Sequence, residues 1–186
     1  TVQVKDENGI SATAKYIPTV TSVTPTGEDV TTTGKQGKVQ TGTPKFTEGD
    51  VEVPLKVDAA QPAKFVVNGT AVEETTIDAT KDGAKVGTYE INPLTGEVTF
   101  TPNKDFVGTP DAVTVQVKDE NGTSATAKYT PTVTAVTPTG EDATSTGKQG
   151  KVQTGTPKFT EGDAEVPLKV DADQAAKFIV NGTAVE

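Results

Sequence analysis

The alternation of apolar and polar positions is clearest in a segment that occurs twice. In residues 114–129, Val115 and Val117 alternate with polar residues, and a similar alternation resumes after Asn121-Gly122. A period of two is typical of a strand with one buried face, and Asn-Gly between two such runs favours a type I′ hairpin turn. Because one face of this hairpin is apolar, we expect it to lie on a second sheet.

The same hairpin sequence stands at residues 1–16, because residues 1–73 recur as residues 114–186. The two copies are offset by 113 positions and differ at only nine of their 73 paired positions, whereas residues 74–113 occur once. A period of this length is too long for one turn of a solenoid. Each repeat should therefore be a self-contained domain in a tandem array.

A stretch with little apolar character suggests where one repeat ends. Residues 24–38 contain one sizeable apolar side chain, Val30, among threonine, glycine and charged residues, which indicates a linker or an irregular lead-in. The predicted domains are 1–23, the C-terminal strands of a preceding repeat; 24–136, one complete repeat; and 137–186, the N-terminal part of the following repeat.

The ends of the chain lead to two further expectations. The chain reads as a piece of a longer protein, so we expect its two incomplete repeats to dock on the edges of the central repeat or on a neighbouring chain. The junctions between repeats should be stiffened by prolines, whose rings limit backbone freedom. These prolines are Pro18, Pro25, Pro131 and Pro138.

Within residues 24–136 the pattern predicts an all-β fold, an antiparallel β-sandwich that is Ig-like in a loose sense, repeated in tandem. Short strands at regular spacing, with turns between them and no helical periodicity, are typical of this class. The predicted strands span residues 38–40, 52–57, 63–67, 71–77, 85–91, 97–101, 112–118 and 124–133. The predicted turns are Asn68-Gly69, Leu94-Thr95-Gly96 and Asn121-Gly122, and Pro54 marks a sheet edge or a bulge. The predicted core is Val53, Leu55, Phe65, Val67, Tyr89, Ile91, Val98, Phe100, Phe106, Val115, Val117, Ala127 and Tyr129.

Composition supports small domains with thin cores. Hydrophobic residues make up 32% of the 186 residues, Trp and Met are absent, and the aromatic residues are six Phe and three Tyr. The 18 Gly and 12 Pro, with abundant Thr and Val, favour strands and turns. No apolar segment approaches the roughly 20 residues that a membrane-spanning helix needs.

Charge and missing residue types restrict the possible functions. The formal net charge of −9 disfavours nucleic acid and anionic membranes as partners. The chain has no Cys and no His, so it lacks thiolate chemistry and the commonest general base. A serine without such a base is not activated as a nucleophile. We therefore expect no enzyme activity and no cofactor, and we assign no catalytic, cofactor-binding or metal-binding residue.

Two short motifs have plain structural interpretations. Residues 34–38, GKQGK, lack the spacing and the Ser or Thr of a phosphate-binding loop, which indicates a flexible turn. Three Asn-Gly-Thr triplets fit the glycosylation pattern, but each also stands where a hairpin needs Asn-Gly. These triplets begin at Asn68, Asn121 and Asn181.

Two ways of stiffening the array remain open as hypotheses. Acidic clusters at a domain junction could hold Ca²⁺, although none has the EF-hand spacing. A lysine next to a core aromatic could form an intramolecular isopeptide bond, but strand alternation points Lys64 and Lys128 outward. The acidic clusters lie at residues 6–8, 28–29, 48–50, 119–121, 141–142 and 161–163.

Three segments in order carry a family resemblance. They are GKQGKVQTGTPKF with EGD and VPL, then GTYEINPLTGEVTFTP followed by a turn at Phe106, then VTVQVKDENGTSATAKYTPTV. This order resembles the CshA-type fibril repeat of Gram-positive, streptococcal-like, cell-wall-anchored surface adhesins. The resemblance spans residues 24–136 and both partial copies.

The resemblance implies a structural stalk repeat on the cell surface. Such repeats would extend a distal binding region from the cell wall, with the export signal, wall anchor and ligand-binding region outside this sequence. Neighbouring repeats of the same chain would be its partners, and any host or bacterial surface protein would bind elsewhere. The alternative is that each repeat itself binds such a partner weakly and gains avidity from copy number.

Overall fold

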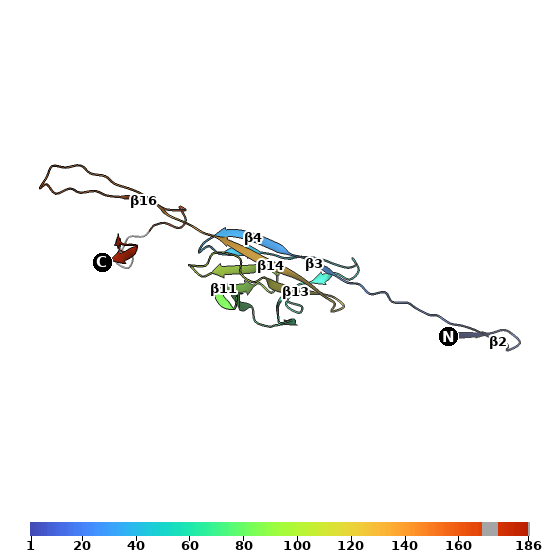
Figure 1. The fold of residues 1–186 in the computed structure, drawn as a ribbon. Coiled ribbons are helices and arrows are strands. Elements are labelled where there is room, and N and C mark those ends of the chain that lie inside the picture. The colour runs from blue at the N-terminus through green and yellow to red at the C-terminus, as the bar shows by residue number, and fades with distance from the viewer. Residues whose placement is uncertain (169–174, 186) are drawn as a thin grey trace.

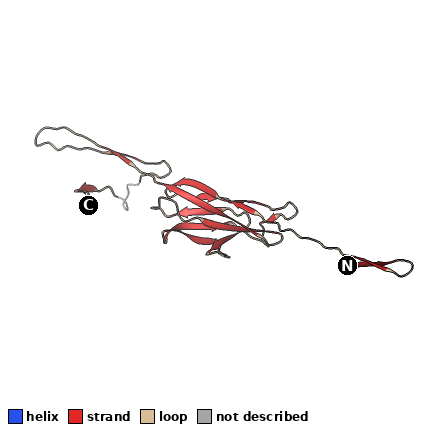
Figure 2. Ribbon diagram, turned by 45° about the vertical axis from the view of Figure 1, so that its right-hand side comes forward, coloured by secondary structure: helices blue, strands red, loops and turns tan. Residues whose placement is uncertain are grey.

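The computed structural model of the chain describes residues 1–168 and 175–185, and these contain strands but no helix. Figures 1 and 2 show a central body built from the middle of the chain, with the two end segments leaving it on opposite sides. No helix among the described residues could cross a membrane. The strands are β1 (Val2–Lys5), β2 (Ser11–Ala14), β3 (Thr26–Glu28), β4 (Val30–Lys35), β5 (Gln40–Gly42), β6 (Lys45–Thr47), β7 (Leu55–Lys56), β8 (Lys64–Val67), β9 (Thr70–Ala71), β10 (Thr76–Lys81), β11 (Ala84–Ile91), β12 (Val98–Pro102), β13 (Val113–Asp119), β14 (Ser124–Thr134), β15 (Thr139–Glu141), β16 (Lys158–Thr160), β17 (Phe178–Val180) and β18 (Thr183–Val185).

The central body is a β-sandwich, which confirms the predicted fold class. One sheet has the order β10-β11-β12-β5, and the other has the order β4-β14-β13-β8-β9, with β7 also paired to β13. Strands β13 and β14 bury every second residue along their lengths, as the predicted alternation requires. A smaller pair, β3 with β6, lies beside β14.

The core lies between the two sheets and is centred on aromatic rings. Tyr89 and Phe100 of one sheet have ring centroids 5.2 Å apart, and Tyr89 meets Tyr129 of the other sheet edge-on at 6.2 Å. Such tilted and edge-on arrangements are favourable beyond the area that they bury. The buried apolar residues of this cluster are Ala63, Phe65, Ala79, Tyr89, Ile91, Val98, Phe100, Val113, Val115, Val117, Ala125, Tyr129 and Val133.

Most of the predicted core residues are buried. The prediction is wrong for Val67, which stands at the end of its strand beside a hairpin turn and is 38% exposed. Val53 and Leu55 are half-buried, because the segment around them makes only short bridges and a two-residue strand. The half-buried Phe106 packs against the core.

The prediction that residues 24–38 form a linker or an irregular lead-in is wrong. This segment supplies β3 and β4, and β4 pairs in parallel with the end of β14 from Tyr129↔Val30 to Thr134↔Lys35. The β4–β14 pair is the exception in a body whose other paired strands are antiparallel. Its pattern misled the sequence interpretation because it presents Val30, Thr32 and Gly34 inward, where threonine replaces the expected apolar residue.

The turns follow the sequence signals in part. Asn68 and Gly69 both have positive φ between Val67 and Thr70, which is the predicted two-residue type I′ turn. At residues 119–123 only Gly122 has positive φ, and the Asp119 amide donates to the Thr123 carbonyl. This turn is therefore a three-residue loop with a left-handed glycine, and the type I′ prediction is wrong there.

One hairpin was not anticipated. Asp82 and Gly83 both have positive φ between Lys81 and Ala84, so they form a two-residue turn between β10 and β11. The predicted strand 71–77 is replaced by short β9 and by β10, which begins at Thr76. Asp-Gly between two strand-like runs was the signal for this turn.

The two end segments, residues 1–23 and 137–186, form no core among the described residues. Hairpin β1–β2 is exposed on all its residues and lies apart from the central body, so the prediction that it docks there is wrong (Figure 1). In the other end segment, Phe159 and Phe178 are exposed, although their copies Phe46 and Phe65 pack in the core. The described residues of these two segments include no counterpart of residues 74–113, which supply most of one sheet.

The prolines also differ from their predicted role. Pro131 is buried within β14, paired with Thr32 of β4, and Pro25 is buried at the start of the central body. Neither belongs to a free linker. Pro18 and Pro138 lie on exposed chain outside the sandwich.

We predict that Gly42→Ala destabilises the protein by about 1–3 kcal/mol, as expected for an overpacked site. A Cβ at Gly42 would lie 2.4 Å from Cε2 of Tyr129, and that ring is fully buried. Chemical denaturation followed by circular dichroism measures the change.

The matched control is Gly155→Ala, because Gly155 is the copy of Gly42 in the following repeat. A Cβ there meets nothing closer than Ala143 Cβ at 3.7 Å, so the unfolding midpoint should not move. Equal effects of the two substitutions would show that residue 42 does not pack as described.

Candidate functional site at the two poles of the complete repeat

Carboxylates of the acidic clusters accept hydrogen bonds from backbone amides, some within turns and one across strands. Asp29 Oδ1 accepts a hydrogen bond from the Lys128 amide at 2.7 Å, and Asp50 Oδ1 accepts one from the Glu52 amide at 2.8 Å. The fully buried Asp119 accepts one from the Thr123 amide at 2.7 Å. Within the described residues no group of three or more acidic side chains is placed to hold a metal ion. The structure thus offers the calcium hypothesis no site in that part of the chain.

The two lysines considered for an isopeptide bond point outward, as strand alternation predicted. Lys128 is exposed between buried Ala127 and Tyr129. Lys64 reaches Glu73 on the surface and forms an ion pair with it. The structural interpretation of the Asn-Gly-Thr triplets is confirmed at Asn68 and Asn181, whose positive φ serves two-residue turns.

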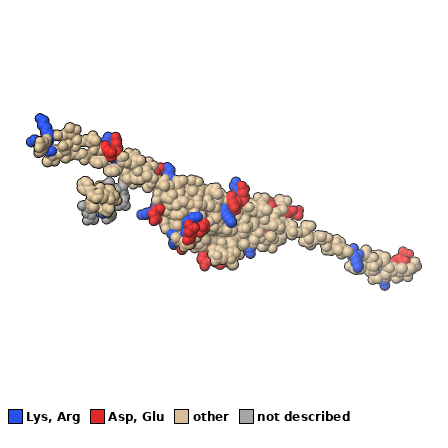
Figure 3. All heavy atoms as spheres, in the orientation of Figure 1, with Lys and Arg blue, Asp and Glu red and all other residues tan. Residues whose placement is uncertain are grey.

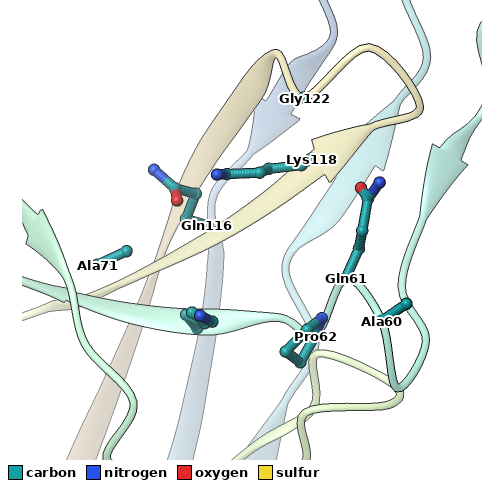
Figure 4. Close-up of a pocket in the computed structure, with 8 residues that line it drawn as sticks. Ala60, Gln61, Pro62, Ala71, Gln116, Lys118 and Gly122 are labelled. Atoms are coloured by element: carbon teal, nitrogen blue, oxygen red, sulfur yellow. The ribbon is translucent and has the colours of Figure 1, made fainter.

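The hollow shown in Figure 4 lies beside β8 and the β13–β14 hairpin. Its wall carries the polar ends of Gln61, Gln116 and Lys118, and its apolar lining consists of alanine and proline side chains. Ligand pockets are usually lined by larger hydrophobic and aromatic groups that converge on the ligand. This hollow has the character of an ordinary surface depression.

A buried hydrogen-bond network ties the first strands of the repeat to its last strand. The Tyr129 hydroxyl and Thr32 Oγ1 are 2.8 Å apart, and Thr32 Oγ1 also donates to Gln40 Oε1 at 2.7 Å. Gln40 Nε2 then donates to the Thr132 carbonyl at 3.1 Å. Buried polar groups are costly unless they are satisfied in this way.

The two core tyrosines have perturbed phenols. Burial raises the pKa of Tyr89 well above its ordinary value, and the nearby Tyr129 and Asp111 add to the shift. Burial also raises the pKa of Tyr129, against the opposing effect of its hydrogen bond with Thr32. Tyr89 donates to the Asp111 carbonyl at 2.9 Å, so both phenols are satisfied as donors or acceptors in their neutral form.

The repeat has two poles, because its chain enters at one end of the sandwich and leaves at the other (Figure 1). The N-terminal pole comprises Thr24 and residues 48–52, which we name the acidic turn. The two lie together because Gly49 packs against the backbone of Thr24. The C-terminal pole comprises residues 35–38, named the basic loop, together with Lys104 and Val136.

Gln36 holds the C-terminal pole together. Its amide donates to the Thr134 carbonyl at 2.8 Å, and its side-chain nitrogen donates to the Lys104 carbonyl at 3.2 Å. Its side-chain oxygen accepts from the Val136 amide at 3.4 Å. The GKQGK segment is a turn, as predicted, with the Lys38 amide bonded to the Lys35 carbonyl. Its role in binding the departing chain could not be read from its sequence.

Two ion pairs join this pole to the following repeat. Lys35 pairs with Asp163, and Lys38 Nζ lies 3.8 Å from Glu165 Oε2. The hydrogen bond between Lys35 and Asp163 raises the pKa of the ammonium group and lowers that of the carboxyl group. Sequence reasoning missed these four residues as partners. The recurrence of both GKQGK and EGD with the same period was the signal that could have paired them.

The fold and the poles define a class of protein. A sandwich of short strands with a thin core, entered and left at opposite ends and followed by a near-copy of itself, is a module of a tandem array.

The family follows from comparison with known proteins. A family model described as the surface adhesin CshA repetitive domain matches residues 22–133 and again residues 135–186. The chain therefore belongs to this family of surface adhesin repeats, which is not a family of enzymes and implies an extracellular surface protein. The two matches begin 113 residues apart, which equals the period of the sequence repeat. No curated protein matches the chain.

We predict that the protein loses stability above about pH 10, the ordinary pKa of a tyrosine. A phenol whose pKa is raised by folding contributes stability that is fully present below the pKa of the unfolded state. That contribution is lost as the pH rises toward the folded pKa. The phenolate absorbance of Tyr89 and Tyr129 should thus appear together with the loss of the β-sheet circular dichroism signal.

The Tyr16→Phe variant isolates this signal, because Tyr16 is the exposed copy of Tyr129. Phenolate formation by both remaining tyrosines near pH 10, with the circular dichroism spectrum still native, would contradict the prediction.

Proposed function

We propose that this chain is part of the stalk of a fibrillar surface adhesin, anchored in the cell wall of a Gram-positive bacterium. In this proposal residues 24–136 form one complete repeat, and the array of repeats extends a distal binding region from the cell. Neighbouring repeats of the same chain are its partners, and it needs no cofactor.

The parallel pairing of β4 with β14 carries the proposal. These are the first long strand and the last strand of the repeat, and they lie side by side over six paired residues. Two antiparallel neighbours in these positions would bring entry and exit to one pole. Because the pair is parallel, entry and exit fall at opposite poles, and each added repeat lengthens the array.

The surface of the complete repeat suits a spacer. Its exposed large hydrophobic residues are scattered singly among polar ones, and these are Val39, Val51, Val67, Leu94 and Val107. On the face in Figure 3, acidic and basic side chains are interspersed over the central body. Such a surface resists sticking between fibrils. Among the described residues of the repeat, no cluster of exposed aromatic side chains supports the alternative that each repeat binds a partner itself.

We predict that arrays of two, three and four repeats are elongated. Small-angle scattering should give a radius of gyration that grows in proportion to the number of repeats, because each unit is added at the far pole. A compact protein grows only with about the 0.38 power of its length. Growth of that compact kind would overturn the stalk proposal.

We further predict that the repeat resists tension through the β4–β14 pair. Pulling on the two ends of the chain loads this parallel pair in shear, so its hydrogen bonds must break together. Single-molecule pulling measures the unfolding force, which is governed by the unfolding rate and hence by the height of this barrier.

The control changes only the direction of pulling. Handles on Lys35→Cys and Thr134→Cys, which are paired residues at the same pole, peel the strands apart one bond at a time. The force should be lower in this geometry. Equal forces in the two geometries would show that the β4–β14 pair does not carry the load.

A further inference from the structure

The basic loop and the acidic turn occupy opposite poles of one repeat. In the complete repeat, the acidic turn of residues 48–52 packs beside Thr24, where the chain enters. The basic loop is bonded to Thr134 and Val136, where the chain leaves. A head-to-tail array therefore sets the basic loop of each repeat next to the acidic turn of the following one.

The structure shows one such meeting. Only Ala135 and Val136 separate the end of β14 from Thr137, and the following acidic turn packs back on Thr137 through Gly162. The two lysines of the basic loop then pair with Asp163 and Glu165. The two segments also enclose a hollow, whose lining includes side chains from both repeats.

The acidic turn has the same local structure in both copies, even though the described residues of the second copy form no core. The Glu165 amide donates to Asp163 Oδ1 at 2.9 Å, as the Glu52 amide does to Asp50 Oδ1. Bridges Asp50↔Val53 and Asp163↔Val166 are also equivalent. Strands β15 and β16 pair as β3 and β6 do. The turn is thus built from its own segment, and a complete following repeat would present it in the same way.

We infer that the basic loop of each repeat binds the acidic turn of the next repeat and so sets the angle between neighbouring domains. This inference rests on the proposed stalk function. The interface is heterologous, since it joins two different surfaces, and it therefore propagates along the array instead of closing on itself. Exposed ion pairs are individually weak, but here a short connection holds them at high effective concentration.

The test measures the distribution of distances across the junction. The chain has no cysteine, so Glu90→Cys on β11 and Thr160→Cys on β16 accept two spin labels and no others. Both positions are exposed strand residues. Double electron–electron resonance should give one narrow distribution of distances between the two labels in the otherwise unchanged chain. A broad distribution would overturn the inference.

Charge reversal then identifies the contacts. Lys35→Glu with Lys38→Glu should broaden the distribution and lower the ratio of closed to open junctions about fivefold. The rescue uses the pair of Lys38 with Glu165, because Glu165 contributes only its backbone amide to the turn. Lys38→Glu alone should broaden the distribution, and adding Glu165→Lys should narrow it again, since the pair is restored with inverted sign. A reversal without effect, or without recovery in the swapped variant, would overturn the inference.

The matched control is Lys148→Glu with Lys151→Glu, which changes the copies of the same two lysines and gives the same net charge. These lysines lie at the exposed far end of the following segment, so the distribution should stay narrow. Unfolding midpoints check that every variant keeps the central fold. If charge reversal leaves the distances unchanged while the arrays are elongated, the interface is rejected and the stalk proposal stands. Compact arrays would reject the stalk, whatever the junction measurement shows.

Discussion

The position of the Tyr129 ring is the constraint on which the rest of the fold depends. The ring is fully buried between the sheets, meets Tyr89 edge-on, and leaves no space for a side chain at position 42. Its hydroxyl is tied to Thr32. One residue thus joins the last strand of the repeat to its first strands and to the opposite sheet. A thin core with few aromatic residues can specify a single arrangement only if each ring has this kind of defined set of neighbours.

This arrangement has a direct consequence for the shape of the array. Fixing Thr32 beside Tyr129 fixes β4 beside β14. The two parallel strands then stay paired as far as Lys35 and Thr134, where both end. The basic loop must then turn at the pole where the chain leaves. A packing interaction in the core therefore determines where entry, exit and the charged loop lie, which are the features that a stalk requires.

The sequence predicted the β13–β14 hairpin strands and the Asn68-Gly69 turn well, and the first strands poorly. The alternation around Val115 and Val117 found β13 and β14 because the buried positions there are apolar. The same rule failed for β4 and for β5, the next strand along the chain, because Thr32, Gln40 and Gly42 face inward there instead of apolar side chains. Thr32 and Gln40 form hydrogen bonds with Tyr129 and Thr132 of β14, which lie far away along the chain. Only the tertiary structure supplies that information. The ion pairs between repeats differ in this respect, because GKQGK and EGD recur with one period and could have been paired from the sequence.

The incomplete copies show how far local sequence determines structure in this family. Phe65 is fully buried whereas its copy Phe178 is 79% exposed, although the surrounding sequences are almost the same. What differs is the presence of residues 74–113, which supply Tyr89, Ile91, Val98 and Phe100. Turns and short hairpins form in both contexts because their hydrogen bonds are local. Core burial requires the opposite sheet. Burial of the core of a repeat therefore depends on its own middle section, and a local match between two sequences does not by itself reproduce the fold.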